Sequence, residues 1–260
     1  MSELTPMKKQ YREIKEKYQD CLLFFRLGDF YEMFDEDALI ASKQLNLTLT
    51  TRDRAEPDPE KRTPMCGVPF HSAPAYISKL VEAGHKVAIC EQAVVPNAPK
   101  GLYSRKVIRV ISPGLITDAS MLPEGKSNYI GAVYMDETAA AVAFCDISTG
   151  EFGTACFDSD AVTHIINELT RFSPRELIMN REAAETAAIT DFAKNRLGCM
   201  LEMGGNDYEF MPCAARVCEQ FGAESLDALG LGDAESGQGD LARQHGAKGL
   251  LALEVVTGEH

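Results

Sequence analysis

The chain has 260 residues, of which 45% are hydrophobic and 25% charged, and a formal net charge of −13. This length and composition fit two globular domains and exclude a disordered chain, a collagen-like repeat and a coiled-coil rod. No run approaches the ~20 consecutive apolar residues of a membrane-spanning helix, and no signal-peptide core follows the first residues, so we expect a cytoplasmic protein without a membrane partner. The eight cysteines include no CxxC pair, which favours reduced, buried thiols over a zinc ribbon or a disulfide scaffold.

The negative charge is concentrated in the second half of the chain. Residues 1–126 hold 18 basic and 17 acidic residues, net +1, whereas residues 127–260 hold 8 and 22, net −14. Only the first half is therefore suited to face a polyanion. Four basic residues there follow one another with no acid between them: Lys100, Arg105, Lys106 and Arg109. This run is either a phosphate-facing patch or a charged strand edge.

The first half of the chain alternates helical and strand patterns. Thr5 followed by Pro6 marks a helix start. After Gly28, apolar residues recur at spacings of three and four, which predicts one helix of about four turns that begins at Asp29. In chain order we expect a helix at 6–18, a strand at 22–25, a helix at 29–45, a strand at 46–51, a polar loop at 52–62, a helix at 72–83 and strands at 85–91 and 103–111.

A linker rich in proline and glycine is expected at residues 113–127, because it shows no sustained apolar period. It separates a mixed α/β domain at 1–112 from a second α/β domain at 128–229, and residues 230–260 form a tail that the pattern leaves uncertain. In the second domain we expect an antiparallel meander of strands at 129–135, 140–146 and 151–157, then a helix at 161–170, a strand at 176–179 and a helix at 183–197.

Two motifs suggest chemistry. Gly125, Lys126 and Ser127 resemble the end of a phosphate-binding P-loop, but the first glycine of that motif is missing and a strand rather than a helix follows, so we interpret them as linker. Three acids of the second domain, Asp136, Asp146 and Glu151, suggest a Mg²⁺-dependent nuclease. Asp136 falls in the turn between two expected strands, where aspartate favours local backbone hydrogen bonds, so turn and capping roles are favoured and the nuclease stays an alternative.

The most informative segment surrounds Phe30. Asp29 and Glu32 fit a capping box at the start of the predicted helix. Phe30 then lies in the first turn at the margin of the apolar stripe, where its ring is able to project past the helix end toward a partner. On these residues alone, a second interpretation remains open, in which Phe30 is one more core aromatic.

The chain resembles the amino-terminal part of the MutS family of DNA mismatch sensors. The resemblance rests on FRLGDFYEMF at residues 25–34, TPMCGVPFH at 63–71 and VAICEQ at 87–92, with support from residues 105–114. DISTG at 146–150 is the clearest shared block of the second domain. The resemblance implies a mixed α/β mismatch-recognition domain followed by a ribonuclease-H-like connector domain.

The resemblance also implies a function, namely recognition of mispaired or unpaired bases in double-stranded DNA. Phe30 is expected to enter the minor groove and stack on the mispaired base, while Glu32 hydrogen-bonds that base. Unstacking costs least where pairing is already defective, so deformable steps are selected by energy. An unpaired carboxylate near phosphates weakens binding to intact duplex. Met65 is expected beside Phe30, and Arg105, Lys106 and Arg109 on the DNA backbone.

Whole members of the family are several times longer and carry an ATPase domain with a true P-loop. We therefore expect a truncated or altered chain without catalysis, metal or cofactor of its own, although ATP and Mg²⁺ serve the full-length family. The connector is expected to offer an acidic surface to mismatch-repair partner proteins, and dimerisation to use parts beyond this sequence. A protein-docking module without a DNA role is the third alternative.

Overall fold

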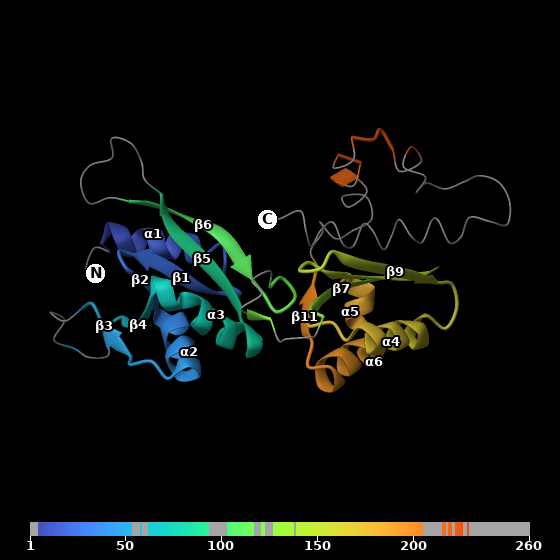
Figure 1. The fold of residues 1–260 in the computed structure, drawn as a ribbon, viewed down its shortest axis with the longest axis horizontal. Coiled ribbons are helices and arrows are strands. Elements are labelled where there is room, and N and C mark those ends of the chain that lie inside the picture. The colour runs from blue at the N-terminus through green and yellow to red at the C-terminus, as the bar shows by residue number, and fades with distance from the viewer. Residues whose placement is uncertain are drawn as a thin grey trace. The chain divides into compact units, whose positions relative to one another are not determined.

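The computed structural model divides the chain into two compact units, Met1–Pro113 and Gly114–His260 (Figure 1). Within the described residues, no helix is long and apolar enough to cross a membrane. The structure describes residues 5–53, 58, 62–93, 103–116, 121–122, 127–137, 139–204, 215–216, 218–219, 222–225 and 228. The predicted tail at 230–260 lies outside these residues.

The first unit is a six-stranded sheet with helices on both faces, α1 on one and α2 and α3 on the other (Figure 1). The strand order is β3-β4-β2-β1-β5-β6, in which only the β1–β5 pair is parallel. The elements are α1 (Pro6–Lys15), β1 (Cys21–Leu27), β2 (Phe30–Phe34), α2 (Asp35–Leu45), β3 (Thr50–Thr51), β4 (Pro64–Pro69), α3 (Ala73–Glu82), β5 (Lys86–Ala93) and β6 (Ser104–Ile111).

The predicted helix at 29–45 is wrong in its first third. Residues 30–34 form strand β2, which pairs antiparallel with β1 through a tight turn at Gly28 and Asp29, and helix α2 begins only at Asp35. Gly28 adopts a left-handed φ of 61°, which glycine allows without steric cost. Asp29 therefore caps no helix, and Glu32 is a strand residue rather than part of a capping box.

The other elements of the first unit lie near their predicted places. The Thr5 side chain accepts a hydrogen bond from the Lys8 backbone N–H and caps α1, which ends at Lys15 rather than near residue 18. Strand β3 is reduced to two residues, and Asn46, the first residue of the predicted strand, instead ends α2 in a left-handed conformation. Strand β4 was not predicted.

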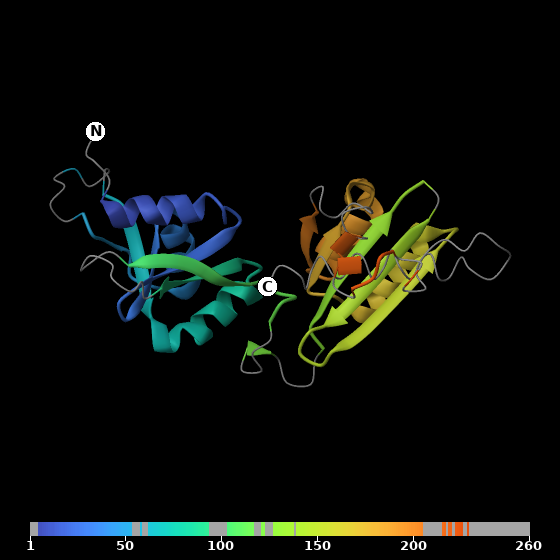
Figure 2. The ribbon, with the colours of Figure 1, turned by 90° about the horizontal axis from the view of Figure 1, so that it is seen from above.

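The second unit is a five-stranded sheet of order β11-β10-β7-β8-β9. The three predicted meander strands lie side by side with antiparallel pairing (Figure 2), and β10 pairs parallel with β7 and β11. Helices α4, α5 and α6 pack on one face (Figure 1). The elements are β7 (Tyr129–Met135), β8 (Ala140–Asp146), β9 (Glu151–Phe157), α4 (Ala161–Phe172), β10 (Glu176–Met179), α5 (Arg181–Glu185), α6 (Ala187–Asp191) and β11 (Met200–Met203).

The mixed α/β class with two sheets is thus confirmed, and the second unit differs from its prediction at one helix and one strand. The helix expected at 183–197 is divided at Thr186, and a short π-helix, Phe192–Arg196, follows α6. Strand β11 was not predicted. Part of the expected linker packs on this sheet, since the Gly114 N–H donates to the buried Glu176 carboxylate at 3.0 Å.

Candidate nucleic-acid interface

Strand β2 presents Phe30, Glu32 and Phe34 on the sheet face that carries α1, because side chains alternate along a strand. Phe34 is buried under α1, with its ring centroid 4.9 Å from that of Tyr11. Phe30 lies at the opposite end of the strand, next to the β1–β2 turn, and 46% of its surface is exposed. Its ring is therefore available to a partner, although a hairpin rather than a helix end places it there.

Glu32 is paired with an arginine that the sequence analysis did not single out. Nε of Arg52 donates to Oε2 of Glu32 at 2.8 Å, and Nη2 donates to Oε1 at 2.5 Å. The side chain of Glu32 is 11% exposed and that of Arg52 is 46% exposed. This two-point hydrogen bonding to Glu32 raises the pKa of Arg52. The negative charge of Glu32 is therefore paired with a positive one, whereas the sequence predicts an unpaired carboxylate.

Arg52 is held in place by the first residues after β3. Strand β3 pairs with β4, and β4 separates it from β2, so the Arg52–Glu32 ion pair spans β4. The next residue, Asp53, binds Nζ of Lys8 at 2.6 Å and the backbone N–H of Thr63 at 3.1 Å. These bonds lower the pKa of Asp53 to about 2. The chain is thus tied to α1 directly beside Arg52.

Gly67 of β4 leaves the space that Glu32 occupies. The two residues are in register, and a Cβ on Gly67 would lie 3.3 Å from Cγ of Glu32 and 3.1 Å from the Tyr31 carbonyl oxygen. These distances are tighter than ordinary van der Waals contact. Glycine at this position therefore lets the glutamate side chain lie against the strand and reach Arg52.

Arg52 and Arg105 line one groove of about 390 Å³ beside the start of α1. Arg105 uses several of its donors within the chain: Nε donates to the Arg26 carbonyl at 2.8 Å and Nη1 to the Gln10 side chain at 2.9 Å. Its guanidinium also lies 4.9 Å from the centre of the Phe25 ring, and burial lowers its pKa. The other residues that line the groove are Thr5, Pro6, Met7, Gln10, Leu27, Gln92 and Tyr103.

The other predicted site residues lie on strands β4 and β6. Met65 is in register with Phe34, four residues along β4 from Pro69, the partner of Phe30. The expectation that Met65 lies beside Phe30 is therefore wrong, because the strand register separates them by roughly 13 Å. On β6, Arg105 and Lys106 project to opposite faces of the sheet. Arg109 is in register with Ile89 of β5 and follows a β-bulge in β6. Lys100 lies outside the described residues.

A second exposed aromatic, Phe70, stands near the β1–β2 turn. Its backbone N–H donates to the Asp29 carbonyl at 3.0 Å, and 40% of its surface is exposed. The guanidinium of Arg26 lies 3.7 Å from the centre of the Phe70 ring and donates to the Gly28 carbonyl at 2.5 Å. Arg26 therefore links Phe70 to the turn that precedes Phe30.

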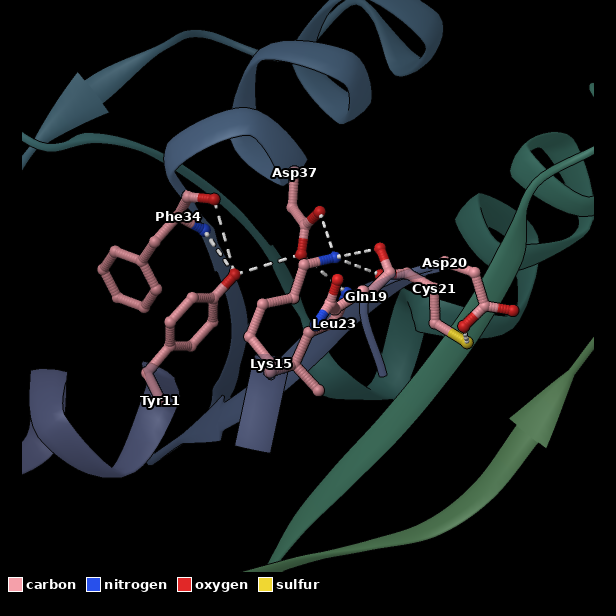
Figure 3. Close-up of polar contacts among 8 residues, drawn as sticks. All are labelled: Tyr11, Lys15, Gln19, Asp20, Cys21, Leu23, Phe34 and Asp37. Carbon is pink, nitrogen blue, oxygen red and sulfur yellow. Dashed lines mark hydrogen bonds and ion pairs between the residues drawn. The ribbon is translucent and has the colours of Figure 1, made fainter. Parts of the chain in front are cut away.

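A buried hydrogen-bond network surrounds Asp37 in the first unit (Figure 3). Its carboxylate accepts hydrogen bonds from the Leu23 backbone N–H at 3.0 Å, from the Tyr11 hydroxyl at 3.1 Å and from Nζ of Lys15 at 2.9 Å. Burial and the nearby Asp37 raise the pKa of Tyr11, which therefore remains a neutral donor. The network joins α1, β1 and α2, and its satisfied donors identify it as structural.

The acids of the second unit also serve the backbone. Asp146 is buried and accepts hydrogen bonds from the backbone N–H groups of Asn128 and Ser148, each at 2.9 Å. Burial raises the pKa of Asp146, but hydrogen bonds from the Ser148 hydroxyl and from the backbone N–H groups outweigh it, and the net pKa is lowered. Asp136 accepts from the Ala139 N–H in the turn at the other end of β8. The described residues contain no group of three side chains suited to a metal ion, and the nuclease alternative is not favoured.

Two family models match the chain in sequence order. MutS domain I matches residues 5–120, and MutS domain II matches residues 128–248. This chain belongs to the MutS family. Domain I thus comprises the sheet that carries Phe30 and Glu32, and the domain II match continues past residue 229, where the sequence analysis placed its end.

Curated relatives agree with this assignment. The DNA mismatch repair protein MutS of Clostridium botulinum strain 657 is 51% identical over 184 residues, which cover 70% of this chain and 19% of the relative. MutS of Acetivibrio thermocellus is 48% identical over 197 residues, which cover 75% of this chain and 22% of the relative. The matched part thus spans about a fifth of the length of these MutS proteins.

One solved structure that matches is that of T. thermophilus RuvC in complex with a Holliday junction substrate. The match covers 50% of this chain and 96% of the RuvC chain, with 12% sequence identity and a TM-score of 0.30. A likeness at this level carries no argument about this chain.

Proposed function

We propose that this chain recognises mispaired or unpaired bases in double-stranded DNA, and that the first unit is the reader. The observation that carries the proposal is the exposed Phe30 ring at the end of β2, two residues from a glutamate on the same face. The MutS relatives are named DNA mismatch repair proteins, which supports DNA as the partner.

The physical basis is the cost of opening a base step. An aromatic ring that enters the minor groove must unstack the bases, at a few kcal/mol per step, and the cost falls where a mispair has already weakened stacking. Phe30 is suited to this because its strand is rigid: β2 is paired on both sides, by β1 and by β4. The ring is thus presented by a sheet rather than by a flexible loop.

Electrostatics favour the first unit as the DNA-binding part. Residues 127–260 carry a net charge of −14, which repels a polyanion, whereas residues 1–126 are close to neutral. We propose the acidic second unit as a surface for repair partner proteins, in line with its match to MutS domain II. Because the chain covers about a fifth of its relatives, this role concerns the residues present here.

The test compares two duplexes that differ by one mispair. Binding of the chain to fluorescently labelled duplexes is measured by anisotropy at low salt, for the wild type and for Phe30→Ala. We expect the wild type to prefer the mispaired duplex and Phe30→Ala to bind both duplexes equally. Equal binding of both duplexes by the wild type contradicts the proposal.

Phe70→Ala is the matched control. Phe70 is a phenylalanine of similar exposure on the same unit, but it stacks on Arg26. We expect it to retain the preference for the mispaired duplex. If Phe70→Ala and Phe30→Ala lose the preference to the same extent, the reader is not Phe30 but a more general aromatic surface.

A further inference from the structure

The Arg52–Glu32 ion pair has a role that the proposed function leaves open. Both oxygens of Glu32 are engaged by one guanidinium, and the glutamate side chain is nearly buried. A carboxylate in such a place is costly to leave unpaired, so Arg52 leaves it only if another donor takes its place.

Arg52 itself is half exposed and lines the groove beside α1, together with Arg105. A guanidinium binds phosphate with the same two-point geometry as carboxylate, so a duplex phosphate in this groove competes with Glu32 for Arg52. Because Asp53, Lys8 and Thr63 fix the backbone next to Arg52, a change of partner needs rotation of its side chain alone.

We propose, on the basis of the proposed function, that Arg52 is a specificity-determining residue that exchanges Glu32 for a DNA phosphate. At a mispair, a base edge donates to Glu32, Arg52 is released, and the guanidinium binds the backbone. At an intact duplex no base replaces Arg52, so the ion pair persists and the phosphate contact is not made. One arginine thus couples recognition of the mispaired base to binding of the DNA phosphate backbone.

Salt dependence distinguishes this exchange from an ordinary phosphate contact. Each phosphate contact contributes about −0.9 to the slope of log K against log salt concentration on duplex DNA. We therefore expect the wild-type slope to be steeper on the mispaired duplex than on the intact duplex by about one contact. Arg52→Ala is expected to remove that difference by changing only the slope for the mispaired duplex.

Glu32→Gln supplies the second arm of a double-mutant cycle. A neutral amide holds Arg52 less strongly, so the guanidinium reaches phosphate on both duplexes. The slope of log K against log salt concentration for the intact duplex is therefore expected to steepen by about one phosphate contact. In the Glu32→Gln background, Arg52→Ala is expected to make the slopes for both duplexes shallower by the same amount. The effect of Arg52 thus depends on Glu32, which a simple phosphate contact would not show.

Two controls keep the test interpretable. Lys9→Ala removes an exposed cation of α1 that pairs with Glu13, and is expected to leave the slope difference between the duplexes unchanged. Arg52→Lys retains the charge and covers the case in which Arg52→Ala fails to fold, as judged by circular dichroism. With one donor point in place of the fork, the Arg52→Lys variant is expected to keep the slope difference at a lower affinity for the mispaired duplex.

The results separate the two proposals. The exchange is overturned if Arg52→Ala, with Glu32 intact, makes both slopes equally shallower or changes neither slope. The proposed function stands in that case, provided that Phe30→Ala still abolishes the preference for the mispair. If the wild type binds both duplexes equally, the proposed function fails and the exchange fails with it.

Discussion

The Asp37 network yields a quantitative prediction for the stability of the first unit. Asp37 is 3% exposed and accepts from a backbone N–H, a tyrosine hydroxyl and a lysine ammonium. Asp37→Asn retains the shape but loses the ion pair with Lys15 and turns an amide N–H₂ toward one of these donors. Breaking a buried charged hydrogen bond costs about 2–4 kcal/mol, so we expect the first unit to lose about 3 kcal/mol.

Hydrogen exchange followed by mass spectrometry reports this loss at the right place. Since 1.4 kcal/mol is a factor of ten, a loss of about 3 kcal/mol speeds exchange of the protected β1 amides roughly 100-fold. Peptides from β7 and β8 in the second unit provide the internal reference. Asp35→Asn is the matched control, because Asp35 is exposed and its left-handed φ of 52° is one that asparagine tolerates. Equal exchange of β1 in the two variants refutes the reasoning.

Three further predictions follow. Gly131→Ala places a Cβ 2.9 Å from the Phe144 ring, so we expect the urea midpoint of the second unit to fall by the equivalent of about 1–3 kcal/mol; an unchanged midpoint contradicts this packing. Hydrogen bonds from Lys8 and Thr63 lower the pKa of Asp53, so its carboxylate stabilises the first unit above about pH 4 and loses this effect as the pH falls toward 2. In urea titrations at each pH, Asp53→Asn is therefore expected to lower the free energy of unfolding above about pH 4, by an amount that disappears toward pH 2. Burial raises the pKa of Cys90 to about 12, so iodoacetamide at pH 8 is expected to label Cys90 only after unfolding, and rapid native labelling would oppose this.

The second unit was the easier one to predict from sequence. Its three meander strands and β10 match their predicted ranges, because turn residues at 136–137 and 148–150 separate short apolar runs. The predicted helix at 183–197 is wrong because apolar periodicity does not show the interruption at Thr186, whose backbone is extended. Strand β11 was missed because its residues are only partly buried and carry a weak pattern.

The first unit shows why short aromatic segments are ambiguous. Tyr31 and Phe34 fit a helical stripe with Ala38, yet they lie on opposite faces of a strand and in separate parts of the core. The turn residues Gly28 and Asp29 between two aromatic runs were the available signal for a hairpin. The predicted place of Phe30 in the first turn of a helix is wrong, but its predicted exposure agrees with the structure.

The site could be predicted only in the part that is local in sequence. Phe30 and Glu32 share a face in a strand as a matter of alternation, but Arg52 reaches Glu32 through the pairing order β3-β4-β2, which no sequence pattern of the chain specified. The same holds for Gly67, whose missing side chain matters only once β4 lies beside β2. Long-range strand register decides both, and it also separates Met65 from Phe30.

The central claim is that the Phe30 ring enters a weakened base step. Nuclear magnetic resonance of the chain with ¹³C-labelled phenylalanine rings, assigned with Phe30→Ala, observes this contact directly. With a mispaired duplex, we predict that the Phe30 ring signals move upfield from base stacking while those of Phe70 move little, and that an intact duplex leaves both in place. Unchanged Phe30 signals at saturating mispaired duplex would contradict the account.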